Sequence, residues 1–228
     1  PEDLLIRIRV VNRGSDEAEL SLIPTLWLRN LWDWGYKEDW RQRSPICRDG
    51  DGIKTPDVHG IGSYQLACRQ QGTWLFTENA TNTERLYQQP NQQPYVKDAF
   101  HRYVVNGEQE AVNPAQEGTK AGLLLQQRIA GGGEWVVDLR LARQLPADPF
   151  DDSFDQLLQQ REQECLDYFD SCAPGLSADD ALIFRSAASG LLWCKKFYRW
   201  TVVRWLSGDP NHPSPPPERL KSENAYWR

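Results

Sequence analysis

The sequence KAGLLLQQRIAGGGEWVVDLRL, residues 120–141, decides the fold class. Two segments rich in apolar residues, 120–129 and 134–141, flank the three glycines 131–133. The second segment is apolar without strict alternation. Glycine suits tight turns because it adopts positive φ angles without a steric penalty. The pattern therefore predicts two antiparallel strands that the glycine turn joins as a hairpin.

Further strand-like segments precede this pair. Residues 4–11 (LLIRIRVV) alternate apolar and basic side chains, as a half-buried strand does. Residues 19–27 predict a second strand, broken by Pro24. Residues 63–78 predict another hairpin, with strands on either side of a Gln-Gln-Gly turn. Together these segments predict an antiparallel β-sandwich over residues 1–145.

The pattern then changes from strands to helices. Residues 151–169 (DDSFDQLLQQREQECLDYF) repeat apolar residues at helical spacing, and we expect a helical linker over residues 146–176. The following segment, 178–206, is apolar on most sides and predicts one long helix capped by Ser177. We expect this helix to begin an α-domain, residues 177–228, whose remainder is missing. The predicted fold class is α+β.

Composition narrows the function classes. The 228 residues carry a formal charge of −6. An acidic chain without a basic stripe argues against nucleic acid as a partner, and no apolar run approaches the roughly 18 residues of a membrane span. Five irregularly spaced cysteines without a CxxC pair, beside three scattered histidines, argue against a zinc site. We predict reduced thiols, no metal, no cofactor and a cytoplasmic location. The sequence leaves the oligomeric state open.

The ends of the chain suggest a larger protein. The sequence contains no Met, opens directly in a strand pattern and closes without an obvious helix terminus. We therefore expect a piece of a longer polypeptide, from which some functional residues are absent.

Tryptophans are concentrated in residues 24–40 (PTLWLRNLWDWGYKEDW), among charged and amide side chains. A flat apolar ring beside carboxylates and amides suits a sugar, because the ring takes C–H groups and the polar groups take hydroxyls. The same composition suits a strand end and corner buried against a core, with its polar groups facing outward. Both interpretations stay open.

Residues 76–101 combine amides, acids and a histidine without a helical or strand period. We predict a structured loop that either carries function or packs two domains together. The aromatic segment 197–205 and the prolines after it either line the mouth of a pocket or pack on each other. The candidate residues for substrate binding or a domain interface are Trp32, Trp34, Lys97, Asp98, His101, Tyr198, Trp200 and Trp205. We expect segments 27–40 and 78–101 to meet near the junction of the β-domain with the helical part, where the first five of these residues fix the domain geometry.

Adjacent carboxylates occur at 38/39, 151/152 and 179/180. Inverting glycoside hydrolysis needs two carboxylates about 6.5–9.5 Å apart across a water. Neighbours in sequence usually point apart, and the latter two pairs suit helix starts, where acids complement the helix dipole. No residue of the chain is therefore assigned as a catalytic acid or base.

Five ordered motifs resemble bacterial proteins of glycoside hydrolase family 63, the relatives of processing α-glucosidase and mannosylglycerate hydrolase. The motifs are LPTLWxRNxWxWG (with Ile23 in place of Leu), FTENxTNxxRL, PYVKDAFHxYVV, GTKA and LWxKxFYxxxVxxWLxGDPxxPxPPPER, at residues 23–35, 76–86, 94–105, 118–121 and 192–219.

The resemblance implies an N-terminal β-sandwich followed by an (α/α)6 barrel. It also implies a carbohydrate substrate and inverting cleavage of terminal α-glucosidic or α-mannosidic bonds. In the family both catalytic carboxylates follow the proline-rich stretch, so the resemblance implies that this chain is inactive by itself. The alternative function is a noncatalytic carbohydrate-binding or interaction module.

Overall fold

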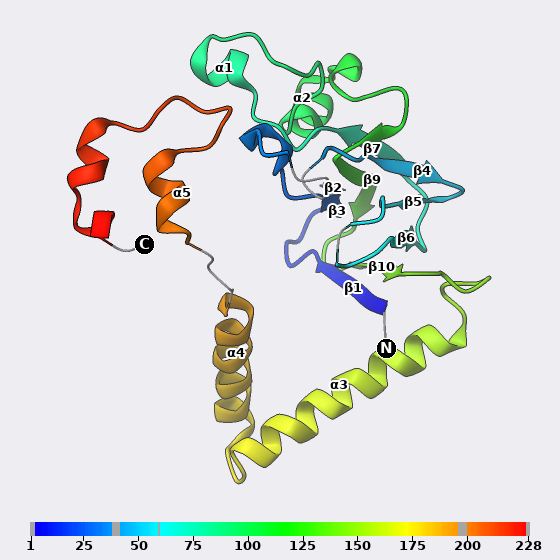
Figure 1. Cartoon of the computed structure of the whole chain (residues 1–228). Coiled ribbons are helices and arrows are strands. Elements are labelled where there is room, and N and C mark those ends of the chain that lie inside the picture. The colour runs from blue at the N-terminus through cyan, green and yellow to red at the C-terminus, as the bar shows by residue number, and fades with distance from the viewer. Residues whose placement is uncertain (1–2, 38–41, 59, 196–199, 227–228) are drawn as a thin grey trace. The chain divides into compact units, whose positions relative to one another are not determined.

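The computed structural model describes residues 3–37, 42–58, 60–195 and 200–226. The chain divides into two compact units, residues 1–150 and residues 151–228. The described part of the first unit holds two antiparallel sheets with short helices, and the described part of the second unit holds helices (Figure 1). The predicted α+β content is therefore confirmed.

The larger sheet has six strands, and all its pairs are antiparallel. In spatial order the strands are β1 (Asp3–Val11), β10 (Glu134–Ala142), β6 (Gln65–Cys68), β5 (Gly52–Lys54), β4 (Ile46–Asp49) and β8 (Glu117–Gly118). The alternating segment at residues 4–11 thus forms the predicted strand.

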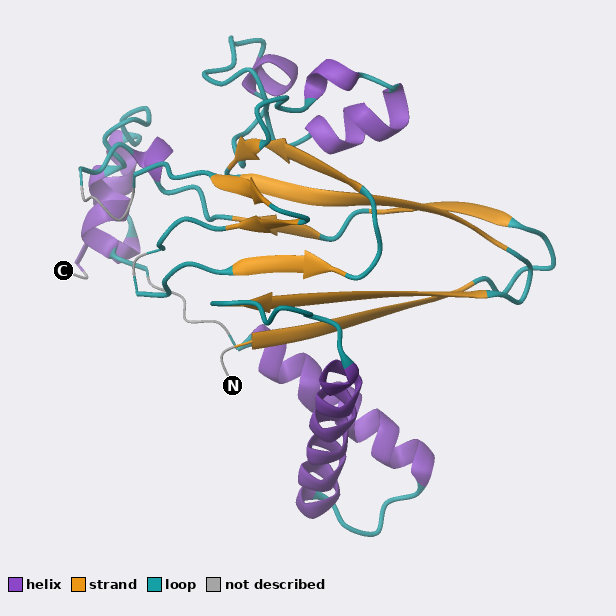
Figure 2. Ribbon diagram, turned by 90° about the vertical axis from the view of Figure 1, so that its right-hand side faces the viewer, coloured by secondary structure: helices purple, strands orange, loops and turns teal. Residues whose placement is uncertain are grey.

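The smaller sheet is built around β9 (Lys120–Ile129). Its three other strands, β2 (Ala18–Leu22), β3 (Thr25–Trp27) and β7 (Thr73–Thr77), each pair with β9 in antiparallel fashion. The break between β2 and β3 falls at Pro24, as predicted, because proline has no N–H to donate to a ladder. The strands of both sheets run roughly along one direction (Figure 2).

The two sheets share one apolar core. Val137 and Leu139 of β10 lie in the same buried cluster as Leu123 and Leu125 of β9 and Phe76 of β7. This packing of two antiparallel sheets is consistent with the predicted β-sandwich.

A short helix covers the other face of the smaller sheet. Phe100, on α2 (Ala99–Asn106), forms a second buried cluster with Leu75 and Leu124. The run Leu123–Leu125 therefore faces apolar surroundings on both sides of the sheet, which explains why it does not alternate. Gly122 permits the close approach, since a Cβ there would lie 2.8 Å from the ring of Phe100.

The hairpin predicted at residues 120–141 is wrong, although both of its strands exist. β9 and β10 belong to different sheets, so the glycine turn crosses from one sheet to the other. The turn packs against the segment that connects β1 to β2. The N–H of Asn12 donates to the carbonyl of Gly133 at 2.9 Å. Gly131 lies so close to this segment that a Cβ on it would be 2.1 Å from the carbonyl oxygen of Ser15. β1 then pairs with β10, and β2 with β9.

The hairpin predicted at residues 63–78 is wrong for the same reason. β6 pairs with β5 and β10, whereas β7 pairs with β9. Gln70 lies in the segment that connects β6 to β7. Its side-chain amide hydrogen-bonds to the backbone of β10 as a paired strand would: it donates to the carbonyl of Val136 and accepts from the N–H of Asp138, each at 3.0 Å.

The second unit contains α3 (Asp152–Cys172), α4 (Ala178–Cys194) and α5 (Val202–Ser207), followed by the 3-10 helices η4 (Pro217–Lys221) and η5 (Glu223–Tyr226). The helix predicted from residue 151 is confirmed. The predicted cap is also confirmed, because the hydroxyl of Ser177 accepts from the N–H of Asp180 at 3.2 Å.

The single helix predicted over residues 178–206 is wrong. α4 ends at Cys194 and a separate helix, α5, begins at Val202. The seven residues between them include three aromatic residues, which are weaker helix formers than leucine or alanine. None of the helices in the described ranges combines the length and apolar character that a membrane span requires.

Candidate functional site

Three distant segments meet at one end of the smaller sheet. Trp27 of β3 and Thr77 of β7 both pair with Lys120, at the start of β9. The residues that follow β3, follow β7 and precede β9 are therefore brought together. These residues belong to segments 28–34, 78–101 and 117–119, which carry most of the candidate residues.

Asn79 connects the three segments through hydrogen bonds. Its side-chain amide donates to the carbonyl of Leu28 at 2.9 Å, and its N–H donates to the hydroxyl of Thr119 at 2.8 Å. In return, the side chain of Asn30 donates to the carbonyl of Asn79 at 3.2 Å. The expected contact between segments 27–40 and 78–101 is thus confirmed for their described residues. Its expected place, at the junction with the helical part, stays a prediction.

Glu78, next to Asn79, forms an ion pair in which the carboxylate is buried and the guanidinium of Arg43 is partly exposed. The carboxylate of Glu78, only 4% exposed, accepts from the guanidinium of Arg43 at 2.5 and 3.1 Å and from the hydroxyl of Thr119 at 2.8 Å. The hydrogen bond to Glu78 raises the pKa of Arg43. Burial of a carboxylate is tolerated only when it is paired and hydrogen-bonded, as here. No sequence pattern pointed to Arg43.

Trp32 and Trp34 form the 3-10 helix η1 (Trp32–Trp34) and are both half-buried. The turn is fixed by Asn30, whose side chain accepts from the N–H of Asp33 at 3.2 Å and donates to its carboxylate. The guanidinium of Arg29 lies 5.5 Å from the ring centre of Trp34. These contacts favour the interpretation of a corner that packs its rings. Trp40 lies outside the described residues.

Lys97 joins the contacts around Asn79 through backbone hydrogen bonds. Its N–H donates to the carbonyl of Ala80 at 2.9 Å, and its carbonyl accepts from the ammonium of Lys120 at 2.7 Å. That ammonium also lies 4.7 Å from the ring centre of Phe100. Burial, together with the nearby charge of Lys97, lowers the pKa of Lys120.

The segment predicted as a loop contains two short helices, α1 (Thr83–Tyr87) and α2, so the prediction of an irregular loop is wrong in part. Asp98 ties them together: its carboxylate accepts from the side-chain amide of Asn82 at 3.1 Å and from Arg85 at 3.3 Å. Asn82 also caps α1, because its side chain accepts from the N–H of Arg85. A five-residue helix gives too short a period to recognise in sequence.

His101 lies on α2 and borders a polar hollow of about 510 Å³. Asn82, Arg85, Asn91 and Glu108 also line this hollow. Glu108 is held by Arg102 at 2.7 Å and by Asn106 at 2.8 Å, and these hydrogen bonds lower its pKa. A general acid needs a raised pKa, so the hollow suits binding of a polar molecule rather than acid catalysis at Glu108.

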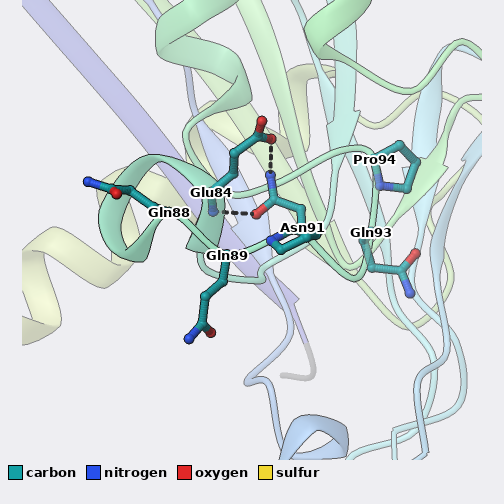
Figure 3. Close-up of a pocket in the computed structure, with 7 residues that line it drawn as sticks. Glu84, Gln88, Gln89, Asn91, Gln93 and Pro94 are labelled. Carbon is teal, nitrogen blue, oxygen red and sulfur yellow. Dashed lines mark hydrogen bonds between the residues drawn. The ribbon is translucent and has the colours of Figure 1, made fainter.

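A second hollow of about 660 Å³ is also lined by Asn91 (Figure 3). Figure 3 shows Asn91 bonded to both the N–H and the carboxylate of Glu84, while the side chains of Gln88 and Gln89 extend outward. The lining is mostly neutral amides, which donate and accept hydrogen bonds equally well. The repeated glutamines of residues 88–93 were a signal that sequence analysis passed over.

The other candidate residues lie in the second unit. The rings of Trp200 and Trp205 meet edge to face at 5.7 Å, and the guanidinium of Arg219 lies 4.8 Å from the ring centre of Trp205. Arg219 also donates to the carbonyl of Trp205 at 2.8 Å, and Pro215 packs against Gly208. These contacts favour packing of the aromatic segment on the proline-rich stretch. Tyr198 lies outside the described residues.

Within the described ranges, no group of three or more His, Cys, Asp or Glu side chains could hold a metal ion. No family model matches the chain. The chain is 29% identical over 266 aligned residues to an uncharacterized protein of Saccharomyces cerevisiae, YMR196W. The match takes in 100% of this chain and 24% of the yeast protein, so the chain spans about a quarter of the length of the relative that it matches.

Proposed function

We propose that this chain is the β-domain and the first helices of a glycoside hydrolase similar to family 63. The protein would cleave terminal α-glucosidic or α-mannosidic bonds with inversion, in the cytoplasm. The helices of the second unit would begin an (α/α)6 barrel. The catalytic acid and base would lie outside these 228 residues, so the chain alone would hydrolyse nothing.

One observation carries the proposal. Four of the five motifs that resemble the family, at 23–35, 76–86, 94–105 and 118–121, span about 100 residues of sequence, yet they meet around Asn79. Motifs that only stabilise separate strands have no reason to converge. Motifs that together build one surface do. Two polar hollows lie within residues 82–108, which include parts of two of these motifs.

The proposed role of this surface is positioning. In an inverting hydrolase one carboxylic acid protonates the leaving oxygen while a carboxylate activates water on the opposite face of the sugar. Both steps depend on how accurately the sugar and the two acids are held, and small displacements from outside the reacting centre lower the rate strongly. The hydrogen bonds around Asn79 would keep the segment that carries the hollows in a fixed position within the enzyme.

The alternative, a noncatalytic carbohydrate-binding module, is favoured by the hollow beside Gln88. Its neutral amides are suited to sugar hydroxyls, and it needs no catalytic pair.

Assays of the complete reading frame and of the 228-residue chain test the proposal. We expect the complete protein to hydrolyse an aryl α-glucoside or α-mannoside, NMR to detect the β-anomer as first product, and the chain alone to be inactive. A complete protein that only binds sugars supports the alternative. Release of the α-anomer, or activity of the purified chain, overturns the proposal.

A further inference from the structure

Trp27 and Lys120 lie beside each other on the face of the smaller sheet that α2 covers. They are paired across β3 and β9. The next pair along these strands is hydrogen-bonded, because the N–H of Leu28 donates to the carbonyl of Thr119 at 2.8 Å. Hydrogen-bonded and non-hydrogen-bonded pairs alternate in an antiparallel ladder, so Trp27 and Lys120 form a non-hydrogen-bonded pair, in which the side chains lie closest together. Trp27 nevertheless remains 58% exposed.

A second lysine lies next to this pair. The ammonium of Lys120 donates to the backbone carbonyl of Lys97 at 2.7 Å and lies 4.7 Å from the ring centre of Phe100. Burial, and after it the like charge of Lys97, lower the pKa of Lys120, so the two charges lie close enough to act on each other. Lys97 itself is exposed. Two positive charges and an exposed indole ring, from three of the five motifs, thus lie close together.

The two lysines lack a negative partner within the described ranges. Neither ammonium group forms an ion pair there with a carboxylate. The charge of Asp98 does act on Lys120, but the carboxylate of Asp98 is held by Asn82 at 3.1 Å and by Arg85 at 3.3 Å. Two like charges that are kept near each other both attract an anion placed between them, and binding of an anion relieves their repulsion.

We propose that Trp27, Lys97 and Lys120 bind the phosphate ester of a sugar. The inference is independent of the proposed function, since none of these three residues lines either polar hollow. A phosphate monoester carries a charge of about −1.5 to −2 at pH 7, which two ammonium groups match better than they match the single charge of a carboxylate. Lysine acts on phosphate as a point charge on a flexible stem. The flat indole ring takes the apolar C–H face of the sugar.

Isothermal titration calorimetry of the chain tests the ligand class. The probes are glucose-6-phosphate and mannose-6-phosphate, compared with inorganic phosphate, glucose and glucuronate. We expect at least one sugar phosphate to bind, inorganic phosphate to bind more weakly, and the neutral sugar and the sugar carboxylate to bind more weakly than the sugar phosphate. A chain that binds neither sugar phosphate overturns the proposal. So does a chain that binds glucose or glucuronate as tightly as the sugar phosphate.

A lysine variant tests the charges. Lys97→Met should weaken binding of the sugar phosphate by about tenfold or more, because a charge-assisted contact is lost. The contacts that Lys97 makes within the fold are those of its backbone, which the substitution retains. Lys54→Met, at an exposed lysine of β5, is the matched control and should bind like the unaltered chain. Unaltered affinity of Lys97→Met, or an equal loss in Lys54→Met, overturns the proposal.

A tryptophan variant separates the two parts of the ligand. Trp27→Ala removes the ring but neither positive charge, so it should weaken binding of the sugar phosphate several-fold and leave the affinity for inorganic phosphate unchanged. Trp193→Ala, at a residue of α4 that is 82% exposed, is the control and should change neither affinity. The proposal is overturned if Trp27→Ala binds the sugar phosphate like the unaltered chain, or if it loses the sugar phosphate and inorganic phosphate equally.

Discussion

The side-chain amide of Asn79 donates to the backbone carbonyl of Leu28 at 2.9 Å, across 51 residues of sequence. This bond joins the end of β7 to the end of β3, and the hydroxyl of Thr119 extends it to the start of β9 through the N–H of Asn79. One half-buried amide therefore holds together segments that no local pattern connects.

Asn79→Ala should destabilise the first unit by about 1–3 kcal/mol, because it leaves the carbonyl of Leu28 without its partner. Urea denaturation followed by tryptophan fluorescence measures the change. Asn106→Ala is the matched control: Asn106 is exposed, its side chain donates to Glu108, and its loss should change stability by less than about 0.5 kcal/mol. Equal effects of the two substitutions would contradict the role of Asn79.

Glu78 and Arg43 should show an asymmetric response to substitution. The Glu78 residue is 4% exposed, whereas the side chain of Arg43 is 34% exposed. Arg43→Met leaves a buried carboxylate without its cation, so it should be more destabilising than Glu78→Gln, which leaves a guanidinium that water can hydrate. The double variant should be less destabilised than the sum. A double-mutant cycle by urea denaturation measures the coupling. Additive losses would mean that the pair contributes little beyond its separate contacts.

Sequence patterns predicted which segments become strands but not which strands pair. Alternation at residues 4–11 is a local signal, and it was sufficient for β1. The pairing of β1 with β10 joins residues 131 positions apart, as the contact of Arg7 with Asp138 shows. A glycine turn has the same composition whether it joins neighbouring strands or crosses between sheets, so both hairpin predictions failed at the turn.

The candidate site was predictable only in part, for a similar reason. The motifs marked segments 27–40 and 78–101, and their mixed aromatic and polar character indicated an interface. Arg43 lies in a segment without any motif, and its partner Glu78 is 35 residues away. Such an ion pair can be recognised only in the folded structure, because the sequence separation between side-chain partners on different strands follows no regular spacing.

The cysteines should differ in reactivity with a maleimide. Burial raises the pKa of Cys68 above its usual value of 9.0, whereas Cys165 and Cys194 are exposed. Since the thiolate is the nucleophile, Cys68 should react last, and its rate should continue to rise above pH 9. Its contribution to stability should be present below pH 9.0 and fall as the pH rises through the raised pKa. Mass spectrometry of partially labelled chain gives the order, and early labelling of Cys68 would contradict its burial.

The exposed apolar residues of α4 should bind a hydrophobic dye. Leu191 is 74% exposed and Trp193 is 82% exposed. Large apolar side chains exposed to this degree favour dye binding and aggregation. Replacing both residues with glutamine should lower dye fluorescence without loss of helical circular dichroism, whereas Leu220→Gln, in η4, serves as a control at one isolated exposed leucine. Unchanged dye binding would place the accessible apolar surface elsewhere.

Asp98→Ala should lower stability and activity together if the positioning role is correct. Its carboxylate holds both Asn82 and Arg85, so its loss frees α1 from the start of α2 and loosens one wall of the polar hollow. In the 228-residue chain we expect a loss of about 1 kcal/mol by urea denaturation, because Asn82 loses its acceptor while the exposed Arg85 can be hydrated instead. In the complete protein we expect a fall in kcat of up to about 100-fold, since small displacements away from the reacting centre misalign the reactants.

Asp98→Asn keeps one acceptor oxygen for Asn82 and should fall between Asp98→Ala and the unaltered protein in both measurements. Glu110→Ala, at an exposed acid near the same helix, controls for the change in net charge. Full activity of a destabilised Asp98→Ala protein would separate the fold of this segment from the reaction and contradict the proposed positioning.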